Sequence, residues 1–397
     1  MKRVALVAAT TGYQTRMFAD AAQHAGVELV LATDRCHVLD DPWGDHAVPI
    51  RFDQPENVAA LLREVGPLDG IIAVGDRPAY VAAVAASELG LKFHSPDAVA
   101  TSRNKFLARE RFREAQLPVP EFYRIAVAEE PSAARFYPCV LKPLGLSASR
   151  GVIRADDDQQ FVAAFRRIRA LLEHEELRDF IQVERFIDGK EYALEGMVRG
   201  GRLDVVAVFD KPDPLNGPFF EETIYITPSR ATGTVLRAIV DTTQTATEAL
   251  GLTDGPIHAE MRVNRAGVWM LEIAARPIGG LCAKTIDGLE EFILRCAIGE
   301  EAGLPVSTGA SGVMMIPIPR EGVYSDVAGV DQARSVSGIT EVIITAKQGE
   351  KIVPLPEAKS YLGFIFARGN TPAEVEQALR RAHESLNFEI LGALPLI

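Results

Sequence analysis

Short apolar runs alternate with helical segments through the first hundred residues. RVALVAA, VELVLAT and DGIIAVGD each predict a buried strand, because unbroken apolar runs of this length are typical of parallel sheets covered on both faces. TRMFADAAQHAG and PENVAALLREVG have the spacing of amphipathic helices, and the first ends at Gly26, a residue suited to a helix C-cap. This order predicts a parallel sheet with right-handed crossovers. The turn after the first strand, ATTGYQT, lacks G-x-G-x-x-G, so the pattern does not support a dinucleotide site there.

The pattern changes after residue 100. A helix is expected across SPDAVATSRNKFLARERFREAQ, followed by a strand at YPCVLKP and a long amphipathic helix at DDQQFVAAFRRIRALLEHEEL. FIQVERFI predicts another strand. Two hairpins follow, one with its turn at Gly200–Gly201 and one with its turn at NRAG. The second strand of the latter hairpin ends before the dipeptide RP. We therefore expect a strand-rich central region flanked by helices.

A third region follows Arg295. GVMMIPIP, ITEVIITA and YLGFIFARG predict strands, and TPAEVEQALRRAHESL predicts a terminal helix with Thr371 as N-cap and Pro372 at its first position. The expected fold class is α/β (α+β) with three domains. Their expected bounds are 1–100, 101–295 and 296–397.

Length and composition exclude several classes of protein. A chain of 397 residues is too long for one compact core. Its formal charge of −12 disfavours nucleic-acid binding, which needs a basic surface. The four cysteines form no metal-binding spacing and are expected to be reduced thiols, and no apolar run reaches the roughly 20 residues of a membrane span. The apolar start MKRVALVAATTG is too short for a signal peptide, so we expect a cytoplasmic protein.

The loop LKPLGLSASRGV carries the first chemical signal. Lys142 precedes two glycines and two serines, whose backbone amides and hydroxyls can surround phosphate oxygens. Lys105 can supply a second cation. Glu260 and Glu272 lie on the two arms of one hairpin, which brings both carboxylates to one face, as a Mg²⁺ site requires. Each signal taken singly also fits an ordinary surface loop or a solvated strand.

Taken in order, these motifs resemble the ATP-grasp ligases. The resemblance rests on Lys105, LKPLGLSASRGV, VERFIDGKE and HAEMRVN…VWMLEIAARPIGG, which span most of residues 100–280. The alternating N-terminal domain is similar to the domain that precedes the grasp fold, and the C-terminal region resembles that of bacterial L-amino acid ligase homologues. The resemblance implies ATP and Mg²⁺ or Mn²⁺ as cofactors, small carboxylate and amine substrates, and a homodimer.

The resemblance also implies individual roles. The residues it assigns to ATP are Lys105 and Lys142 (phosphates), Ser147 and Ser149 (the closing loop), Glu184 with the backbone of Arg185 and Ile187 (adenine), and Glu191 (ribose). Glu260 and Glu272 would bind Mg²⁺, and Arg276 would face the reacting carboxylate. Many members carry Asn where this chain has Ala274, which removes one oxygen ligand and leaves the number of metal ions open.

Three further assignments remain open at this stage. His258 shares a strand face with Glu260, so it either removes the amine proton or is a hydrogen-bonded structural histidine. The long segment Phe209–Arg230 fits a lid. Within it Lys211, Glu221 and Arg230 either recognise substrate charges or lie on a solvated surface.

The implied reaction is amide or peptide bond formation through an acyl phosphate, with release of ADP and phosphate, in the manner of a dipeptide ligase. The alternatives are a carboxylase of the biotin carboxylase or purine-pathway type, which activates bicarbonate, and a non-catalytic ATP-binding protein. Lys105, Lys142, both metal carboxylates and Arg276 are all present, which argues against the last alternative. The sequence does not identify the acid or the amine.

Overall fold

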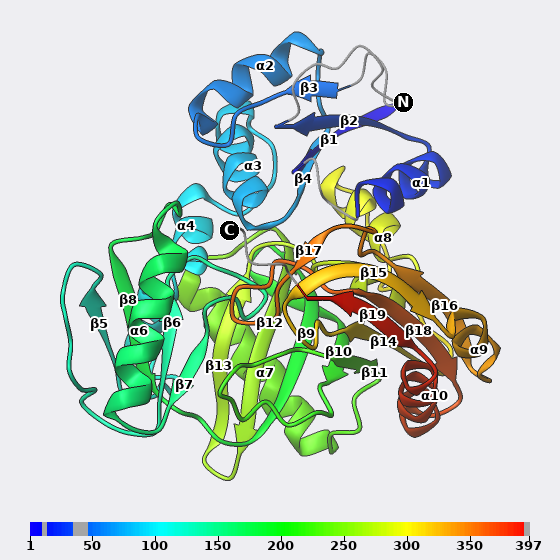
Figure 1. The fold of residues 1–397 in the computed structure, drawn as a ribbon. Helices are drawn as coiled ribbons and strands as arrows, with labels where there is room; N and C mark the ends of the chain where they lie inside the picture. Colours follow the sequence, from blue (N-terminus) through cyan, green and yellow to red (C-terminus); the bar gives the residue numbers. More distant parts are fainter. Residues whose placement is uncertain (10–13, 35–46, 393–397) are drawn as a thin grey trace.

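The computed structural model describes residues 1–9, 14–34 and 47–392. The N-terminal domain holds a parallel sheet of order β3-β2-β1-β4, at the top of Figure 1. Its strands are β1 (Lys2–Ala8), β2 (Val27–Thr33), β3 (Ala47–Pro49) and β4 (Gly70–Val74). Its helices are α1 (Thr15–Ala25), η2 (Pro55–Asn57), α2 (Val58–Glu64) and α3 (Asp76–Leu89). The predicted alternation is confirmed, and Gly26 ends α1 with φ 65°, in the left-handed region that favours glycine.

The single helix expected around Asn104 and Lys105 is wrong. Two helices meet there, α4 (Pro96–Arg103) and α5 (Lys105–Glu114). Asn104 between them is extended, and its side chain accepts hydrogen bonds from the backbone N–H groups of Phe106 and Leu107. Asn104 is therefore the N-cap of α5, and the break directs Lys105 toward the centre of the molecule.

A small antiparallel sheet of order β5-β8-β6-β7 follows, with one long helix against it, at the left of Figure 1. The strands are β5 (Phe122–Ala126), β6 (Cys139–Pro143), β7 (Ile153–Ala155) and β8 (Phe180–Arg185), and the helix is α6 (Asp158–Leu172). Phe161, Phe165 and Ile168 of the helix pack with Leu141 and Val183 of the sheet in one apolar core. This packing holds the strand that carries Lys142 beside the strand that carries Glu184.

The large sheet has the order β13-β12-β9-β10-β11-β14-β18-β16. Its strands are β9 (Lys190–Arg199), β10 (Arg202–Asp210), β11 (Ile224–Thr227), β12 (Gly255–Asn264), β13 (Gly267–Ala274), β14 (Ala310–Ile316), β16 (Ile339–Ile344) and β18 (Gly363–Gly369). Both predicted hairpins are present. The last three strands belong to the predicted third domain, so the sheet crosses the expected boundary at residue 295, and that boundary stays a prediction.

The remaining elements lie in the central and C-terminal regions. They are α7 (Gly233–Leu250), η3 (Cys282–Thr285), α8 (Leu289–Ala297), α9 (Val330–Ser335), α10 (Pro372–Glu384) and a small sheet of β15 (Gly322–Ala328), β17 (Lys351–Ile352) and β19 (Asn387–Leu391). Thr371 caps α10 as expected, with its hydroxyl accepting from the Glu374 N–H. No helix among the described residues has the length and apolarity to cross a membrane.

Candidate active site

A cavity of about 410 Å³ lies where the N-terminal sheet, the small sheet and the large sheet meet. This volume is in the range of small-molecule sites. Most of the predicted site residues line it. They are Lys105, Lys142, Ser147, Ser149, Glu184, Ile187, Glu191, His258, Glu260, Glu272 and Arg276. The fold thus brings residues as far apart in sequence as Lys105 and Arg276, 171 positions, to one cavity.

Arg185 differs from the other predicted residues. Its side chain pairs with Glu121 at 2.9 Å on the surface, and its backbone N–H donates to the Glu121 carbonyl. This N–H is therefore already used within the protein, so it would not be free for an adenine ring. Ile187 does line the cavity, and its carbonyl accepts from Arg262 at 2.6 Å.

Two lysines line the cavity. Lys105 donates to the Leu146 carbonyl at 2.6 Å and pairs with Glu272 at 3.0 Å. Lys142 pairs with the buried Glu184. Burial lowers the pKa of Lys142, although the Glu184 charge opposes this effect. Both ammonium groups are thus largely removed from water. In such a site their attraction to phosphate oxygens is stronger than it would be in bulk solvent.

Glu184 is held by two cations. Burial alone would raise its pKa, but the charges of Arg109 and Lys142 outweigh burial and bring the pKa to about 2. Arg109 donates to Glu184 at 3.1 Å and is itself 1% exposed. Glu184 is therefore ionised at neutral pH and fixes the position of Lys142.

The serine-containing loop has unusual backbone geometry. Ala148 and Ser149 have φ of 53° and 54°, a left-handed conformation that L-residues rarely adopt. Gly151 also has positive φ, and a Cβ there would lie 2.7 Å from Pro143. Its N–H donates to the Pro356 carbonyl at 2.9 Å, which ties the loop to the C-terminal region. Such conformations concentrate at ligand-binding loops.

An apolar slot lies beside the lysines. Val140, Phe186, Phe220 and Leu271 line it, and the Phe186 and Phe220 rings stack with centroids 6.4 Å apart. The segment between β10 and β11, which we expected to be a lid, supplies Phe220 to this wall and packs Leu215 and Phe220 against Val140. This segment is thus part of the packed cavity wall.

The carboxylate hairpin is as predicted. Glu260 and Glu272 are directly paired across β12 and β13. Glu260 also receives a hydrogen bond from the Tyr225 hydroxyl at 3.2 Å and lies 3.2 Å from Lys211. Two facing carboxylates that line a cavity provide the hard oxygen donors that Mg²⁺ prefers, so these residues fit such an ion.

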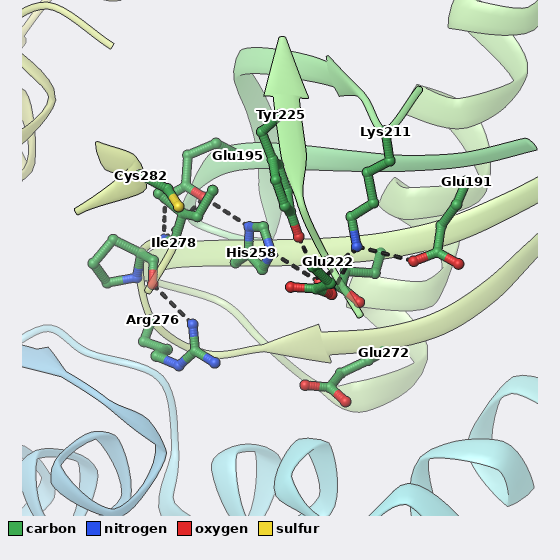
Figure 2. Close-up of polar contacts among 12 residues, drawn as sticks. Glu191, Glu195, Lys211, Glu222, Tyr225, His258, Glu272, Arg276, Ile278 and Cys282 are labelled. Atoms are coloured by element: carbon green, nitrogen blue, oxygen red, sulfur yellow. Dashed lines mark hydrogen bonds and ion pairs between the residues drawn. The ribbon is translucent and has the colours of Figure 1, made fainter. Parts of the chain in front are cut away.

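His258 lies between two carboxylates (Figure 2). Its Nδ1 is 3.1 Å from Glu195 and its Nε2 is 3.4 Å from Glu260. Burial alone would lower its pKa, but these two contacts raise the pKa to about 9. A carboxylate at each nitrogen favours the doubly protonated ring, which has no lone pair with which to accept a proton. This geometry favours the hydrogen-bonded histidine over the amine base.

Arg276 has a partner that the sequence did not reveal. Its Nε donates to Asp76 at 2.8 Å, and its Nη1 donates to the Pro277 carbonyl at 3.0 Å. Burial would lower the pKa of Arg276, but Asp76 raises it well above its usual value. Asp76 begins α3, directly after β4, so the N-terminal domain fixes the cation that faces the cavity.

Three further residues near the hairpin also went unrecognised as a group. Glu222 lines the cavity, Lys211 lies behind it, and Glu195 is fully buried and accepts from the Ile278 N–H with both oxygens. Glu221 and Arg230 do not line the described part of the cavity, and Arg230 pairs with Asp210 at 2.7 Å and Glu376 at 2.8 Å. Lys211 was a candidate because it lies in the long segment, whereas the spacing gave no signal for Glu195 or Glu222.

Two protein families match the chain in consecutive stretches. Residues 135–285 match the ATP-grasp domain, and residues 314–390 match the L-amino acid ligase C-terminal domain 2. The chain is 28% identical to alanine–anticapsin ligase of Bacillus subtilis, over 64% of this chain and 60% of the relative. It is 26% identical to an ATP-grasp enzyme of Aspergillus fumigatus, over 71% of this chain and 57% of the relative. The chain therefore spans about three fifths of the length of these curated relatives.

The fold has a solved counterpart. The structure of an L-amino acid ligase from Bacillus licheniformis superposes with a TM-score of 0.85, covering 99% of both chains at 24% identity. The expected α/β architecture with an N-terminal parallel sheet is thereby confirmed. The chain thus contains an ATP-grasp domain, and its C-terminal part matches the C-terminal domain of L-amino acid ligases.

Proposed function

We propose that the protein is an ATP-dependent carboxylate–amine ligase that joins an amino acid to an amine through an acyl phosphate and releases ADP and phosphate. One observation carries this proposal: Lys105 and Lys142, the paired Glu260 and Glu272, and Arg276 all line a single cavity. This set matches what phosphoryl transfer to a carboxylate needs, with cations on the phosphates and a guanidinium on the acid.

The nucleotide would lie between the small and large sheets. The apolar slot with Phe186 and Phe220 would take the adenine ring, and Glu191 would accept from the ribose hydroxyls. Lys105 and Lys142 would bind the phosphates, and the loop with Ser147 and Ser149 would cover them. Mg²⁺ held by Glu260 and Glu272 would neutralise phosphate charge.

The acid would lie near Arg276. Its carboxylate is a poor electrophile, and phosphorylation converts one oxygen into a good leaving group. Arg276 keeps N–H groups beyond those given to Asp76 and Pro277, because a guanidinium has five donors. These can hold the carboxylate and then the oxyanion formed when the amine attacks. Closure of loop 145–151 would keep water from the acyl phosphate.

Hydroxylamine trapping tests this proposal. Purified protein, ATP, Mg²⁺ and each of a panel of amino acids are incubated with hydroxylamine, and hydroxamate, ADP and AMP are quantified. The proposal predicts hydroxamate and ADP in equal amounts with at least one acid. Bicarbonate-dependent ADP release without hydroxamate would indicate the carboxylase, AMP release would indicate adenylation, and ATP binding without turnover would indicate a non-catalytic protein.

A further inference from the structure

The ammonium group of Lys211 lies among three carboxylates (Figure 2). Its Nζ is 2.9 Å from Glu191, 2.9 Å from Glu222 and 3.2 Å from Glu260. The side chain is 3% exposed, and the ammonium lies 4.8 Å from the centre of the Tyr225 ring. Lys211 thus lies behind the cavity wall, whereas the three carboxylates themselves line the cavity.

The three carboxylates come from separate parts of the large sheet. Glu191 is on β9, Glu260 is on β12, and Glu222 precedes β11. One carboxylate oxygen from each lies within 4.8 Å of the others. Like charges this close repel one another strongly in a buried site, so a cation at the centre stabilises the arrangement.

Lys211 is already engaged within the protein. Two of its three N–H donors go to Glu191 and Glu222, and its charge is also paired with Glu260 at 3.2 Å. This separates Lys211 from Lys105 and Lys142, which line the cavity. Substrate recognition by Lys211, one of the two options left open by the sequence, does not fit this position.

We propose that Lys211 is a positioning residue that acts as the resident cation of the Glu191–Glu222–Glu260 cluster. It fixes Glu191, assigned to the ribose, relative to Glu260, assigned to Mg²⁺. It also occupies the space in which a divalent cation would otherwise bind all three carboxylates. The assignment of these two glutamates rests on the proposed function. The exclusion of a metal from the cluster follows from the contacts alone.

The test replaces the ammonium with an apolar chain of similar length. Lys211→Met is compared with Lys190→Met, which removes an exposed lysine on the same strand as Glu191. Mn²⁺ binding without nucleotide is measured by electron paramagnetic resonance. We expect Lys211→Met to gain one bound Mn²⁺ relative to wild type, and Lys190→Met to gain none.

A second pair of variants tests the proposal if Lys211→Met alone does not fold. Glu222→Gln and Lys211→Met/Glu222→Gln are compared, since the double variant has the wild-type net charge. Removing Lys211 in this background should lower kcat by about 10–100-fold and raise KM for ATP, as loss of an outer-shell partner of a metal ligand does, while KM for the acid changes little.

Three outcomes are distinguishable. Full activity of the double variant relative to Glu222→Gln, or no additional Mn²⁺ in a folded Lys211→Met, overturns the positioning role. Equal losses in every kinetic constant would point to a general structural defect and also overturn it. A wild type that activates no acid refutes the proposed ligase, yet leaves the Mn²⁺ comparison as an independent test of the cluster.

Discussion

Replacing Glu184 by Gln should destabilise the protein markedly. Glu184 is the carboxylate with which both Arg109 and Lys142 pair, and Arg109 is only 1% exposed. The substitution removes this negative charge and leaves both cations. Removing one partner of a buried ion pair typically costs about 3–5 kcal/mol, because the other charge remains buried without its counterion. The pKa gives a similar magnitude: a fall from 4.5 to about 2 corresponds to about 3 kcal/mol of folding free energy.

The pH dependence has a defined sign. Because folding lowers the pKa of Glu184, its contribution is complete above the unfolded pKa near 4.5 and is lost as the pH falls toward about 2. The difference in unfolding free energy between wild type and Glu184→Gln should therefore be largest at neutral pH and shrink below pH of about 4.5.

Urea denaturation monitored by circular dichroism measures this difference. The matched control is Glu121→Gln, whose carboxylate pairs with Arg185 at 2.9 Å but is 60% exposed. An exposed pair contributes at most about 1 kcal/mol. If Glu184→Gln costs no more than this control at neutral pH, the account of Glu184 as the buried anchor of Lys142 is wrong.

Three other variants probe the cavity. Lys142→Ala should weaken nucleotide binding in calorimetry while the protein stays folded, and wild-type turnover with unchanged affinity would contradict the phosphate role. Asp76→Asn leaves Arg276 without its charged partner and should raise KM for the acid on the order of tenfold, since hydrogen bonds to charged groups contribute about 1.5–3 kcal/mol; an unchanged KM would refute this coupling. Glu272→Gln should lower Mg²⁺-dependent ADP formation far more than the melting temperature, and near-normal activity would show that the hairpin is only structural.

Local patterns predicted the parts of the site that are close in sequence. The shared face of His258 and Glu260 followed from their spacing of two, but the turn alone would place Leu271 opposite Glu260, and a register shift between Glu260 and Met261 is what pairs Glu260 with Glu272. The parallel N-terminal sheet followed from its unbroken apolar runs. In these cases the hydrogen-bonding geometry of one or two elements determines the result, and the rest of the chain changes little.

Partners from distant segments could not be predicted in this way. Asp76 and Arg276 are 200 residues apart, and Arg109 and its partner Glu184 are 75 residues apart. The helix break at Asn104 did leave a signal, a capping residue between two helical stretches, which the continuous polar pattern obscured. Lys211 needed the full strand order, because its three partners come from three different strands or their ends.

The central claim is that the acid's own oxygen attacks the γ-phosphate of ATP. It is tested with an acid labelled with ¹⁸O in both carboxylate oxygens, a saturating amine, and ³¹P nuclear magnetic resonance of the products. Transfer through an acyl phosphate predicts one ¹⁸O in each molecule of inorganic phosphate and none in ADP. Label in AMP would show adenylation, and unlabelled phosphate released in step with amide formation would contradict the acyl-phosphate route.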